Sequence, residues 1–512
     1  MDTIGMWQWA RRKPADTALV TPEHERVSFA ELAARANRLA HGLRARGLVE
    51  GDMVAVLLPN SPAWVETFMA TQQIGLYMTA INYHLTAPEV AYILENSGSR
   101  LFISNPRHGA VAREAAARAG LAGSACFAEG GSIQGFAGYE TLLKGQPENE
   151  PEGRRAGELM LYTSGTTGRP KGVRRPLKGV APEEPLVRAR DMARRMYGLT
   201  PGDGCHLVQG PLYHAAPGRI GMRALHLGHT LVLMDKWTPE GALARVERYR
   251  VDNTHMVPTM FHRLLKLPRG GRERHDLSSM RVVLHGAAPC PVETKRKMMR
   301  WWGPVLYEYY GGTEGGGTYV TPEDWLARPG TVGRPWPGSQ VFVLDAEGNE
   351  LPAGRVGVVY FLPSQGPVAY HRDPDKTRAA FRGELLTLGD MGYVDEDGWL
   401  FLSDRRSDLI LSGGVNIYPA EIEAVLHQHA KVADVVVFGL PDEEWGERVQ
   451  AVVQPLEDVA SSPELADELL RFAAESLARY KLPKQIDFVD ELPRLPTGKL
   501  ARREVRERYL PV

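Results

Sequence analysis

The chain has 512 residues, 43% hydrophobic and 24% charged, which is the composition of an ordinary soluble globular protein. This length exceeds what one hydrophobic core accommodates and predicts two to four structural units. A formal net charge of −1 excludes a general electrostatic attraction to nucleic acid or to anionic membranes. The three cysteines, Cys126, Cys205 and Cys290, are far apart, which argues against a disulfide framework and favours a cytoplasmic location.

The N-terminal residues show no targeting or membrane signal. Their basic residues follow the apolar ones and no long apolar stretch is present, so we expect no signal peptide. The longest uncharged run, residues 67–88, contains Gln72, Gln73, Asn82 and His84. Because amides are costly in hydrocarbon, this run predicts a buried helix-turn segment and not a membrane span.

Helical and strand patterns alternate in the first two-thirds of the chain. Ser28 and Glu31 form a capping box before a helix whose leucines at 32, 39 and 43 share one face, and Gly47 ends it. Short apolar runs typical of buried strands follow, at residues 53–59, 100–104, 230–235 and 281–286. Strands that alternate with helices predict an α/β fold with a mostly parallel sheet covered on both faces.

The pattern changes near Gly338. Short strands separated by Gly and Asp turns then indicate an antiparallel subdomain. After residues 404–408 comes a unit of about a hundred residues with mixed helices and strands, enough to fold alone. We therefore expect a large domain over residues 1–404, a small domain over residues 405–512, and a hinge near residues 404–408.

The stretch "YTSGTTGRPKG", residues 162–172, is rich in glycine and hydroxyl groups and contains Lys171. A loop of this kind can direct backbone N–H groups and one full charge at a single anion, which is how phosphate is held. Its spacing is not that of a Walker A loop. Taken alone, it fits a phosphate-binding loop or a solvated surface loop equally well.

Three further stretches favour a nucleotide site. "YEYYGGTEGGG" brings an aromatic ring, a hydroxyl and a carboxylate in order, at Tyr310, Thr313 and Glu314; these suit a base, a phosphate and magnesium. Asp390 and Arg405 suit ribose hydroxyls. "RLPTGKLAR" places Lys499 after a turn near the C-terminus. Each has a plain structural alternative: a buried tyrosine, a hairpin aspartate, a surface lysine.

In this set and order the motifs resemble the adenylate-forming superfamily, specifically its stand-alone acyl-CoA synthetases. The resemblance spans nearly the whole chain, from "FAELAARANRLAHGLRARG" to the terminal lysine motif. It implies a large N-terminal α/β domain, with mostly parallel sheets covered by helices and a small antiparallel β subdomain. It also implies a small, mobile α+β C-terminal domain.

The same resemblance implies the reaction. A carboxylic acid attacks the α-phosphate of ATP, pyrophosphate leaves, and coenzyme A then takes the acyl group from the acyl-AMP. Charge develops on phosphate oxygens, so positioned cations and N–H donors carry the catalysis. No nucleic-acid partner and no membrane span are expected, and the oligomeric state is open between a monomer and a homodimer. A nucleotide-binding protein without catalysis is disfavoured, because both Lys499 and Glu314 are present.

Residue roles follow from the resemblance, position by position. Lys499 would bridge the carboxylate and the α-phosphate, Thr313 would contact that phosphate, and Glu314 would hold Mg²⁺. The phosphate loop would comprise Thr163, Ser164, Gly165, Thr166, Thr167, Gly168 and Lys171. The nucleoside would be held by Gly286, Ala287, Ala288, Tyr310, Asp390 and Arg405. Ser407 takes the hinge position, and Gly413 and Gly414 would let the pantetheine arm of CoA pass.

The acid is less determined. By family position its pocket draws on Tyr213, Arg219, Val257, Gly315 and Gly316, with His214 beside the thiol channel or, alternatively, a structural core histidine. Three consecutive glycines favour a ring or a long chain, or else form a turn. Arg219 and Arg223, four apart on a helix, either read a second polar group on the acid or are solvated, and solvation is the preferred interpretation. His206, His226, His229, His255 and His262 are interpreted as structural.

The acceptor is also open. Coenzyme A is favoured, and a free-standing enzyme that serves a separate carrier protein or another nucleophile is the alternative. The chain ends shortly after Lys499, so we expect no fused carrier domain. Fatty, aromatic and polycyclic acids all remain candidate substrates.

Overall fold

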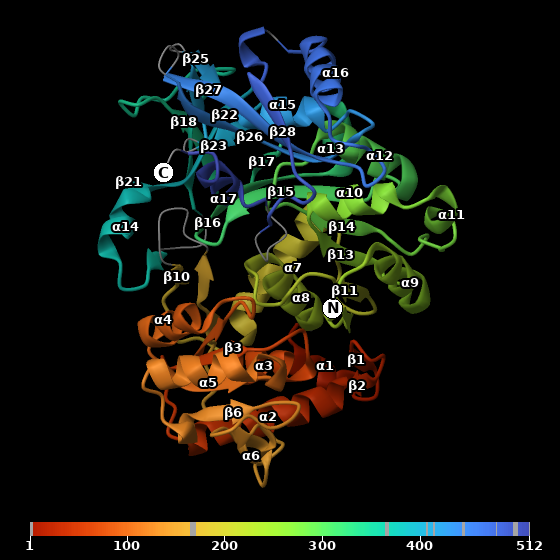
Figure 1. The fold of residues 1–512 in the computed structure, drawn as a ribbon. Helices are drawn as coiled ribbons and strands as arrows, with labels where there is room; N and C mark the ends of the chain where they lie inside the picture. The colour runs from red at the N-terminus through yellow and green to blue at the C-terminus, as the bar shows by residue number, and fades with distance from the viewer. Residues whose placement is uncertain are drawn as a thin grey trace.

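The computed structural model describes residues 4–163, 170–363, 368–405, 408–412, 415–442, 446–477, 479–494 and 500–510. Figure 1 shows the chain rising through the molecule, with the N-terminal sheet at the bottom, a second large sheet in the middle and the C-terminal residues at the top. Within the described residues, no helix is both long and apolar enough to cross a bilayer.

The lowest layer is a six-stranded, wholly parallel sheet in the order β7-β6-β5-β3-β4-β8. Alternate residues of β3 point to opposite faces, where Val54 and Val56 pack with α2 and α3, and Ala55 and Leu57 with α4 and α5. The strands are β3 (Met53–Leu57), β4 (Tyr77–Ala80), β5 (Ser99–Ser104), β6 (Cys126–Ala128), β7 (Ala137–Gly138) and β8 (Glu158–Leu159); the helices are α2 (Phe29–Ala45), α3 (Pro62–Gln73), α4 (Ala87–Ser97), α5 (Gly109–Arg118) and α6 (Glu140–Leu143).

Local signals in this layer are confirmed. Ser28 and Glu31 form the expected capping box, and the leucines at 32, 39 and 43 are fully buried. The uncharged run 67–88 is not a simple helix-turn segment, because the buried strand β4 lies between the end of α3 and the start of α4. Its apolar content reflects a strand buried on both faces of a parallel sheet.

A nine-stranded sheet forms the middle layer, in the order β17-β16-β15-β14-β13-β11-β12-β1-β2. Its centre is parallel and its edges, β2, β16 and β17, are antiparallel. The strands are β1 (Thr17–Val20), β2 (Arg26–Ser28), β11 (Cys205–Val208), β12 (Thr230–Leu233), β13 (Asn253–Met256), β14 (Val282–His285), β15 (Leu306–Gly312), β16 (Gly315–Val320) and β17 (Arg334–Pro335). The helices are α1 (Met6–Arg12), α7 (Glu183–Tyr197), α8 (Ala215–His226), α9 (Pro239–Tyr249), α10 (Pro258–Lys266), α11 (Arg269–Arg272), α12 (Val292–Trp302) and α13 (Pro322–Ala327).

Smaller sheets complete the large domain and confirm the antiparallel region after Gly338. One five-stranded sheet contains β18 (Gln340–Leu344), β19 (Gly357–Leu362), β21 (Phe381–Arg382), β22 (Leu385–Val394) and β23 (Leu400–Arg405). A three-stranded sheet joins β9 (Leu161–Thr163), β10 (Lys171–Arg174) and β20 (Ala369–Tyr370), and α14 (Pro374–Ala379) follows it. The three-stranded sheet holds the two ends of the glycine-rich loop.

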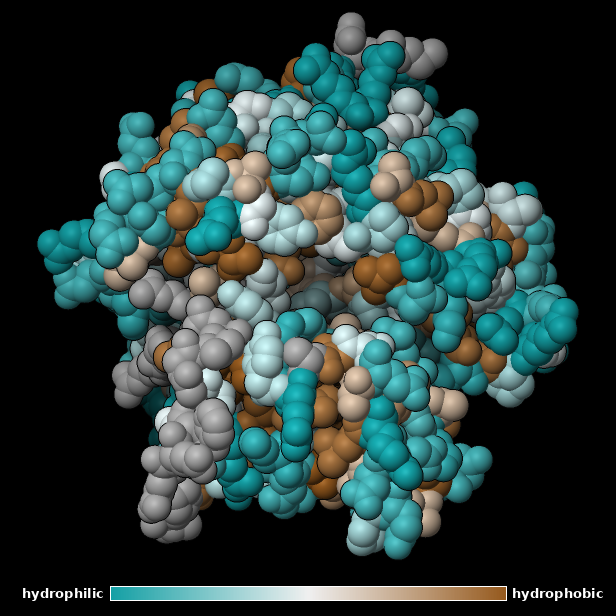
Figure 2. Space-filling view, turned by 90° about the horizontal axis from the view of Figure 1, so that it is seen from above, coloured by the Kyte–Doolittle hydropathy of each residue, from teal (hydrophilic) through white to brown (hydrophobic). Residues whose placement is uncertain are grey.

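The C-terminal residues form a separate five-stranded sheet with its own core, built around Val435, Val453 and Leu469. Its elements are β24 (Ile410–Ser412), β25 (Val415–Ile417), α15 (Pro419–Leu426), β26 (Val432–Asp442), β27 (Gly446–Pro455), α16 (Pro463–Ala474), β28 (Gln485–Phe488) and α17 (Arg502–Glu507). Seen from above, hydrophobic residues gather around a hollow near the centre of the molecule (Figure 2).

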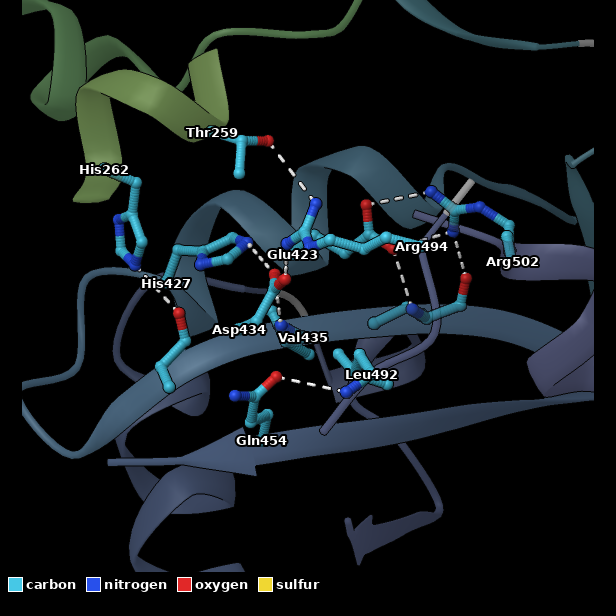
Figure 3. Close-up of polar contacts among 12 residues, drawn as sticks. Thr259, His262, Glu423, His427, Asp434, Val435, Gln454, Leu492, Arg494 and Arg502 are labelled. Atoms are coloured by element: carbon cyan, nitrogen blue, oxygen red, sulfur yellow. Dashed lines mark hydrogen bonds and ion pairs between the residues drawn. The ribbon is translucent and has the colours of Figure 1, made fainter. Parts of the chain in front are cut away.

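The C-terminal domain contacts the large domain through α10 (Figure 3). His262 Nε2 lies 2.8 Å from the carbonyl oxygen of Ala433, and Arg494 Nη1 lies 3.4 Å from Thr259 Oγ1. The rings of His262 and His427 meet edge to face, 5.8 Å apart, and His427 Nε2 lies 3.4 Å from Asp434 Oδ1. Among the described residues these contacts are polar, and the hydrophobic cores of the two domains are separate clusters.

Candidate active site

The glycine-rich stretch lies between two paired strands. Thr163 on β9 is opposite Lys171 on β10, so the chain leaves and re-enters the sheet at one place. Ser164, Gly165, Thr166, Thr167 and Gly168 lie outside the described residues. The ammonium of Lys171 lies 5.0 Å from the centre of the Tyr370 ring. The loop therefore ends beside Tyr370.

The hairpin of β15 and β16 meets the same place. Glu314 Oε1 accepts a hydrogen bond of 2.8 Å from the Tyr370 hydroxyl, and Tyr310 donates one of 2.6 Å to Asp390 Oδ2. Burial and the neighbouring Glu314 carboxylate raise the pKa of Tyr370, which keeps it a donor. Residues from three separate motifs are thus linked: Lys171 and Glu314 through Tyr370, and Tyr310 directly with Asp390.

The remaining nucleoside positions lie on or next to strands. Asp390 on β22 is the register partner of Arg405 at the end of β23, so the two backbones lie side by side. Gly286 follows β14, and a side chain there would come within 2.5 Å of the Tyr309 carbonyl oxygen. Ala287 takes a left-handed conformation with φ of 68°. This segment, Gly286 to Ala288, lies close against the strand that carries Tyr310.

Four positions predicted from the C-terminal domain cannot be located. Lys499, Ser407, Gly413 and Gly414 lie outside the described residues, so their roles stay predictions.

Tyr213 and His214 lie at the start of α8. Their rings are 4.3 Å apart, and the Tyr83 ring packs edge-on against Tyr213 at 5.0 Å. The Tyr213 hydroxyl is buried and has no hydrogen-bond partner among the described residues, and burial raises its pKa. Val257 caps α10 from the end of β13. These are positions that the resemblance assigns to the acid pocket, and that role stays a prediction.

The three glycines, residues 315–317, belong to strand β16 and do not simply form a turn. A side chain on Gly316 would meet Phe361 at 2.7 Å, and one on Gly317 would meet the Tyr310 carbonyl oxygen at 2.3 Å. Gly315 is different, because a side chain there would be 3.5 Å from the guanidinium of Arg175. Gly316 therefore faces packed protein, and Gly315 faces a cation.

Arg219 and Arg223 depart from the preferred interpretation of solvated arginines. Arg219 has a side chain that is 33% exposed, and its Nη2 lies 3.1 Å from Glu158 Oε1. Burial lowers the pKa of Arg223. The reason is tertiary: α8 lies against strands and helices on the side that carries both residues.

Two residues of this region were missed from the sequence. Tyr370 gives no local signal, because it lies far along the chain from both Lys171 and Glu314. Arg175 donates a 2.8 Å hydrogen bond to the Thr313 carbonyl oxygen and follows β10 directly. A second arginine immediately after the loop motif was the signal that could have identified it.

The donor set fits magnesium. A carboxylate oxygen is a ligand that Mg²⁺ prefers, and protein sites for it use one or two carboxylates together with substrate phosphates. Glu314 provides such a carboxylate, and the described residues contain no cluster of three or more histidine, cysteine or acidic side chains. A single carboxylate suits an ion that arrives with a triphosphate.

The five histidines interpreted as structural each have a partner in the fold. His206 bonds Asn253, His229 the Thr200 carbonyl, His226 the Met6 amide, His255 the Tyr309 hydroxyl, and His262 the Ala433 carbonyl. Burial is the main cause that lowers the pKa of all five, which keeps them neutral.

The fold and the joined motifs define a nucleotide-dependent enzyme of two domains, and comparison with known proteins agrees. Residues 6–365 match the model of the AMP-binding enzyme family and residues 421–499 that of its C-terminal domain. A fatty acid–[acyl-carrier-protein] ligase, ScoC, from Streptomyces coeruleorubidus is 34% identical over 98% of this chain and 95% of its own. A feruloyl-CoA synthase from an Amycolatopsis species is 34% identical over 99% of both chains.

A solved structure gives the same result. The amide bond synthetase McbA from Marinactinospora thermotolerans superposes with a TM-score of 0.84, at 29% identity, over 98% of this chain and all of that one. The chain therefore belongs to the adenylate-forming superfamily of AMP-binding enzymes. It is an adenylating ligase that uses ATP and a carboxylic acid.

Proposed function

We propose that this enzyme is an AMP-forming carboxylate–CoA ligase. The observation that carries the proposal is the convergence of Lys171, Tyr370 and Glu314 next to the Tyr310–Asp390 pair. A cation, a carboxylate and an aromatic ring beside a second carboxylate are what a magnesium-bound nucleotide requires at its phosphates, its metal and its nucleoside. The feruloyl-CoA synthase among its relatives supports coenzyme A as acceptor.

In the first half-reaction this chain binds and orients ATP and the acid. Tyr310 stacks on the adenine, and its hydroxyl holds Asp390 in place for the ribose. Lys171 and the loop from Thr163 grip the outer phosphates, Thr313 contacts the α-phosphate, and Lys499 joins that phosphate to the attacking carboxylate. Glu314 would hold Mg²⁺, which would supply positive charge near the phosphate oxygens.

In the second half-reaction a thiol attacks the acyl carbon of the acyl-AMP, forming the thioester and releasing AMP. The C-terminal domain, residues 405–512, then rotates about Ser407. This rotation withdraws Lys499 from the active site and places Gly413 and Gly414 beside the pantetheine arm of CoA. His214 borders the channel by which the thiol arrives. The polar character of the described contacts between α10 and the C-terminal domain supports a domain that can move away from α10.

The second candidate is an adenylating enzyme that serves another acceptor. The carrier-protein ligase and the amide bond synthetase among its relatives support a carrier protein or an amine in place of CoA. In either case we place the enzyme in the cytoplasm, in the activation of fatty or aromatic acids. The separated, unpaired cysteines support that location.

The test is pyrophosphate release across a library of acids, with and without CoA. A CoA ligase releases pyrophosphate with its acid and yields an acyl-CoA thioester only when CoA is added. Lys499→Ala should lower acid-dependent pyrophosphate release by about 10²- to 10³-fold, as for a lost transition-state donor. Pyrophosphate release without any thioester would support the carrier-protein or amine alternative instead.

A further inference from the structure

Three arginines gather beside the predicted acid pocket. Arg175 follows β10, and Arg219 and Arg223 lie one turn apart on α8. Burial is the main cause that lowers the pKa of Arg175 to about 10, and the neighbouring charge of Arg219 is the second cause. Arg219 also adds to the effect of burial in lowering the pKa of Arg223. Geometry links the two elements: the Tyr77 hydroxyl bonds the Arg175 carbonyl oxygen, Tyr77 is the register partner of Glu158, and Glu158 lies 3.1 Å from Arg219.

The position of this arginine cluster, Arg175, Arg219 and Arg223, relates it to the acid. Arg175 Nη2 is bonded to the Thr313 carbonyl oxygen at 2.8 Å, and it would be 3.5 Å from a side chain on Gly315. The Tyr77 hydroxyl donates a 2.7 Å hydrogen bond to the carbonyl oxygen of Arg175. Arg219 lies on the helix that begins at His214. The cluster thus spans the two walls, β16 and α8, between which the acid is predicted to lie.

The carboxylates that approach the cluster have other partners as well. Glu158 approaches Arg219 at 3.1 Å without the alignment of a hydrogen bond, and one of its oxygens also accepts from the Leu159 amide. Glu314, the next carboxylate that acts on Arg175, accepts from Tyr370. Arg175 Nη1 is buried and has no hydrogen-bond partner among the described residues.

Cations whose donor atoms are withdrawn from water are costly unless an anion accompanies them. Arg175 Nη1 is buried and has no hydrogen-bond partner among the described residues, and Arg219 Nη2 makes an unaligned contact with Glu158. Guanidinium groups match the planar geometry of a carboxylate. The Tyr213 hydroxyl, on the same wall as Arg219, adds another unused donor. An occupant with a second anionic group would satisfy these donors, whereas a plain hydrocarbon chain would leave them unpaired.

We propose that the acid substrate is a dicarboxylic acid, whose second carboxylate is bound by Arg175 and Arg219 within the field of Arg223. The inference rests on the proposed function in that an acid occupies this pocket. It assigns the two arginines to substrate specificity and leaves the chemical step to the residues already named. A phosphate of ATP is the other source of the same anionic chemistry, and the experiment separates the two.

The experiment measures acid binding by calorimetry in the presence of AMP, with matched acids that differ in one carboxylate: butanoate and butanedioate, hexanoate and hexanedioate, benzoate and phthalate. In at least one pair the diacid should bind about 10- to 100-fold more tightly, the range of a charge-assisted hydrogen bond. Arg175→Leu and Arg219→Leu should each remove most of that difference and leave the monoacid unchanged. Arg194→Leu, an exposed arginine on α7, is the matched control and should bind as wild type.

Two more variants guard against a folding defect. Arg219→Lys keeps the charge and should retain part of the preference for the diacid. Glu158→Gln removes the competing carboxylate and should strengthen diacid binding, whereas a merely structural Arg219–Glu158 pair predicts no gain.

The proposal is overturned if no wild-type pair shows a preference for the diacid. It is also overturned if the leucine variants weaken both acids equally, or weaken MgATP binding and not diacid binding. Failure of the proposed function would look different: the diacid would bind with the predicted arginine dependence, and yet no pyrophosphate or thioester would form.

Discussion

At the scale of single residues, strand β15 carries one partner of a buried ion pair. Glu308 on that strand accepts a 2.7 Å hydrogen bond from Lys295 of α12, whose side chain is completely buried beneath the Trp325 ring. Burial raises the pKa of Glu308. His285 lies 3.6 Å from the same carboxylate and is buried too. The Lys295–Glu308 ion pair thus stabilises the strand that carries Tyr310.

We predict that Lys295→Met destabilises the large domain by about 3–5 kcal/mol, because it leaves a buried carboxylate without its cation. The double variant Lys295→Met/Glu308→Leu should recover most of that loss, since an apolar pair of similar volume is tolerated. Thermal or urea unfolding of the two variants measures both effects. Equal loss in the single and the double variant would show that shape at this position matters more than charge.

At the scale of elements, the β15–β16 hairpin depends on close backbone contact. Gly311 on β15 is the register partner of Gly317 on β16, and the Trp336 ring lies against both. A side chain on Gly317 would also overlap the Tyr310 carbonyl oxygen. The glycine-rich sequence here therefore permits two strands and an indole to pack closely under the nucleotide residues.

Gly317→Ala should lower stability by about 1–3 kcal/mol, the usual cost of overpacking, and should weaken MgATP binding by displacing Tyr310. Gly138→Ala is the control, because that glycine on β7 has an ordinary φ and no atom within 4 Å of the added carbon. It should change stability by no more than about 0.5 kcal/mol. The comparison needs unfolding curves and nucleotide titrations of both variants, and unaltered MgATP binding in Gly317→Ala would contradict the argument.

At the scale of the whole molecule, the interface between the C-terminal domain and α10 contains two neighbouring histidines, His262 and His427. Burial lowers the pKa of His262 to about 4, helped by Lys266, and burial followed by His262 and Arg494 lowers that of His427 to about 3. Asp434 lies 3.4 Å from His427 Nε2 and also pairs with Arg494. Both rings are neutral in the docked orientation.

The pH dependence of docking follows from those directions. A histidine released from the interface returns toward its ordinary pKa of about 6.5, so the undocked state binds more protons below that value. Docking is therefore complete above about pH 6.5 and weakens as the pH falls toward about 4. Single-molecule FRET between labels on the two domains, from about pH 7.5 to about pH 5, should show this loss.

His262→Gln supplies the control for this prediction. Glutamine can still donate to the Ala433 carbonyl oxygen but does not titrate, so the pH dependence of the variant should be shallower than that of wild type. An identical pH profile in the two proteins would assign the effect to other groups.

Much of this enzyme is readable from the chain alone, because the signals are local. The capping box joins Ser28 to Glu31 three residues away, and buried strands such as Met53–Leu57 appear as short apolar runs. The order of the motifs was enough to identify the superfamily. The alternation of strands and helices also indicated parallel sheets, although not that the strands divide between two of them.

Only the tertiary structure decided which distant side chains meet. Tyr370 contacts Glu314 across 56 residues, and Tyr310 contacts Asp390 across 80. Arg175 and Arg219 come from a strand end and a helix, and neither segment alone shows that the other's charge is near. Periodicity determines which face of an element is buried, but the pairing of faces depends on how sheets and helices pack, and that packing is set by the whole chain.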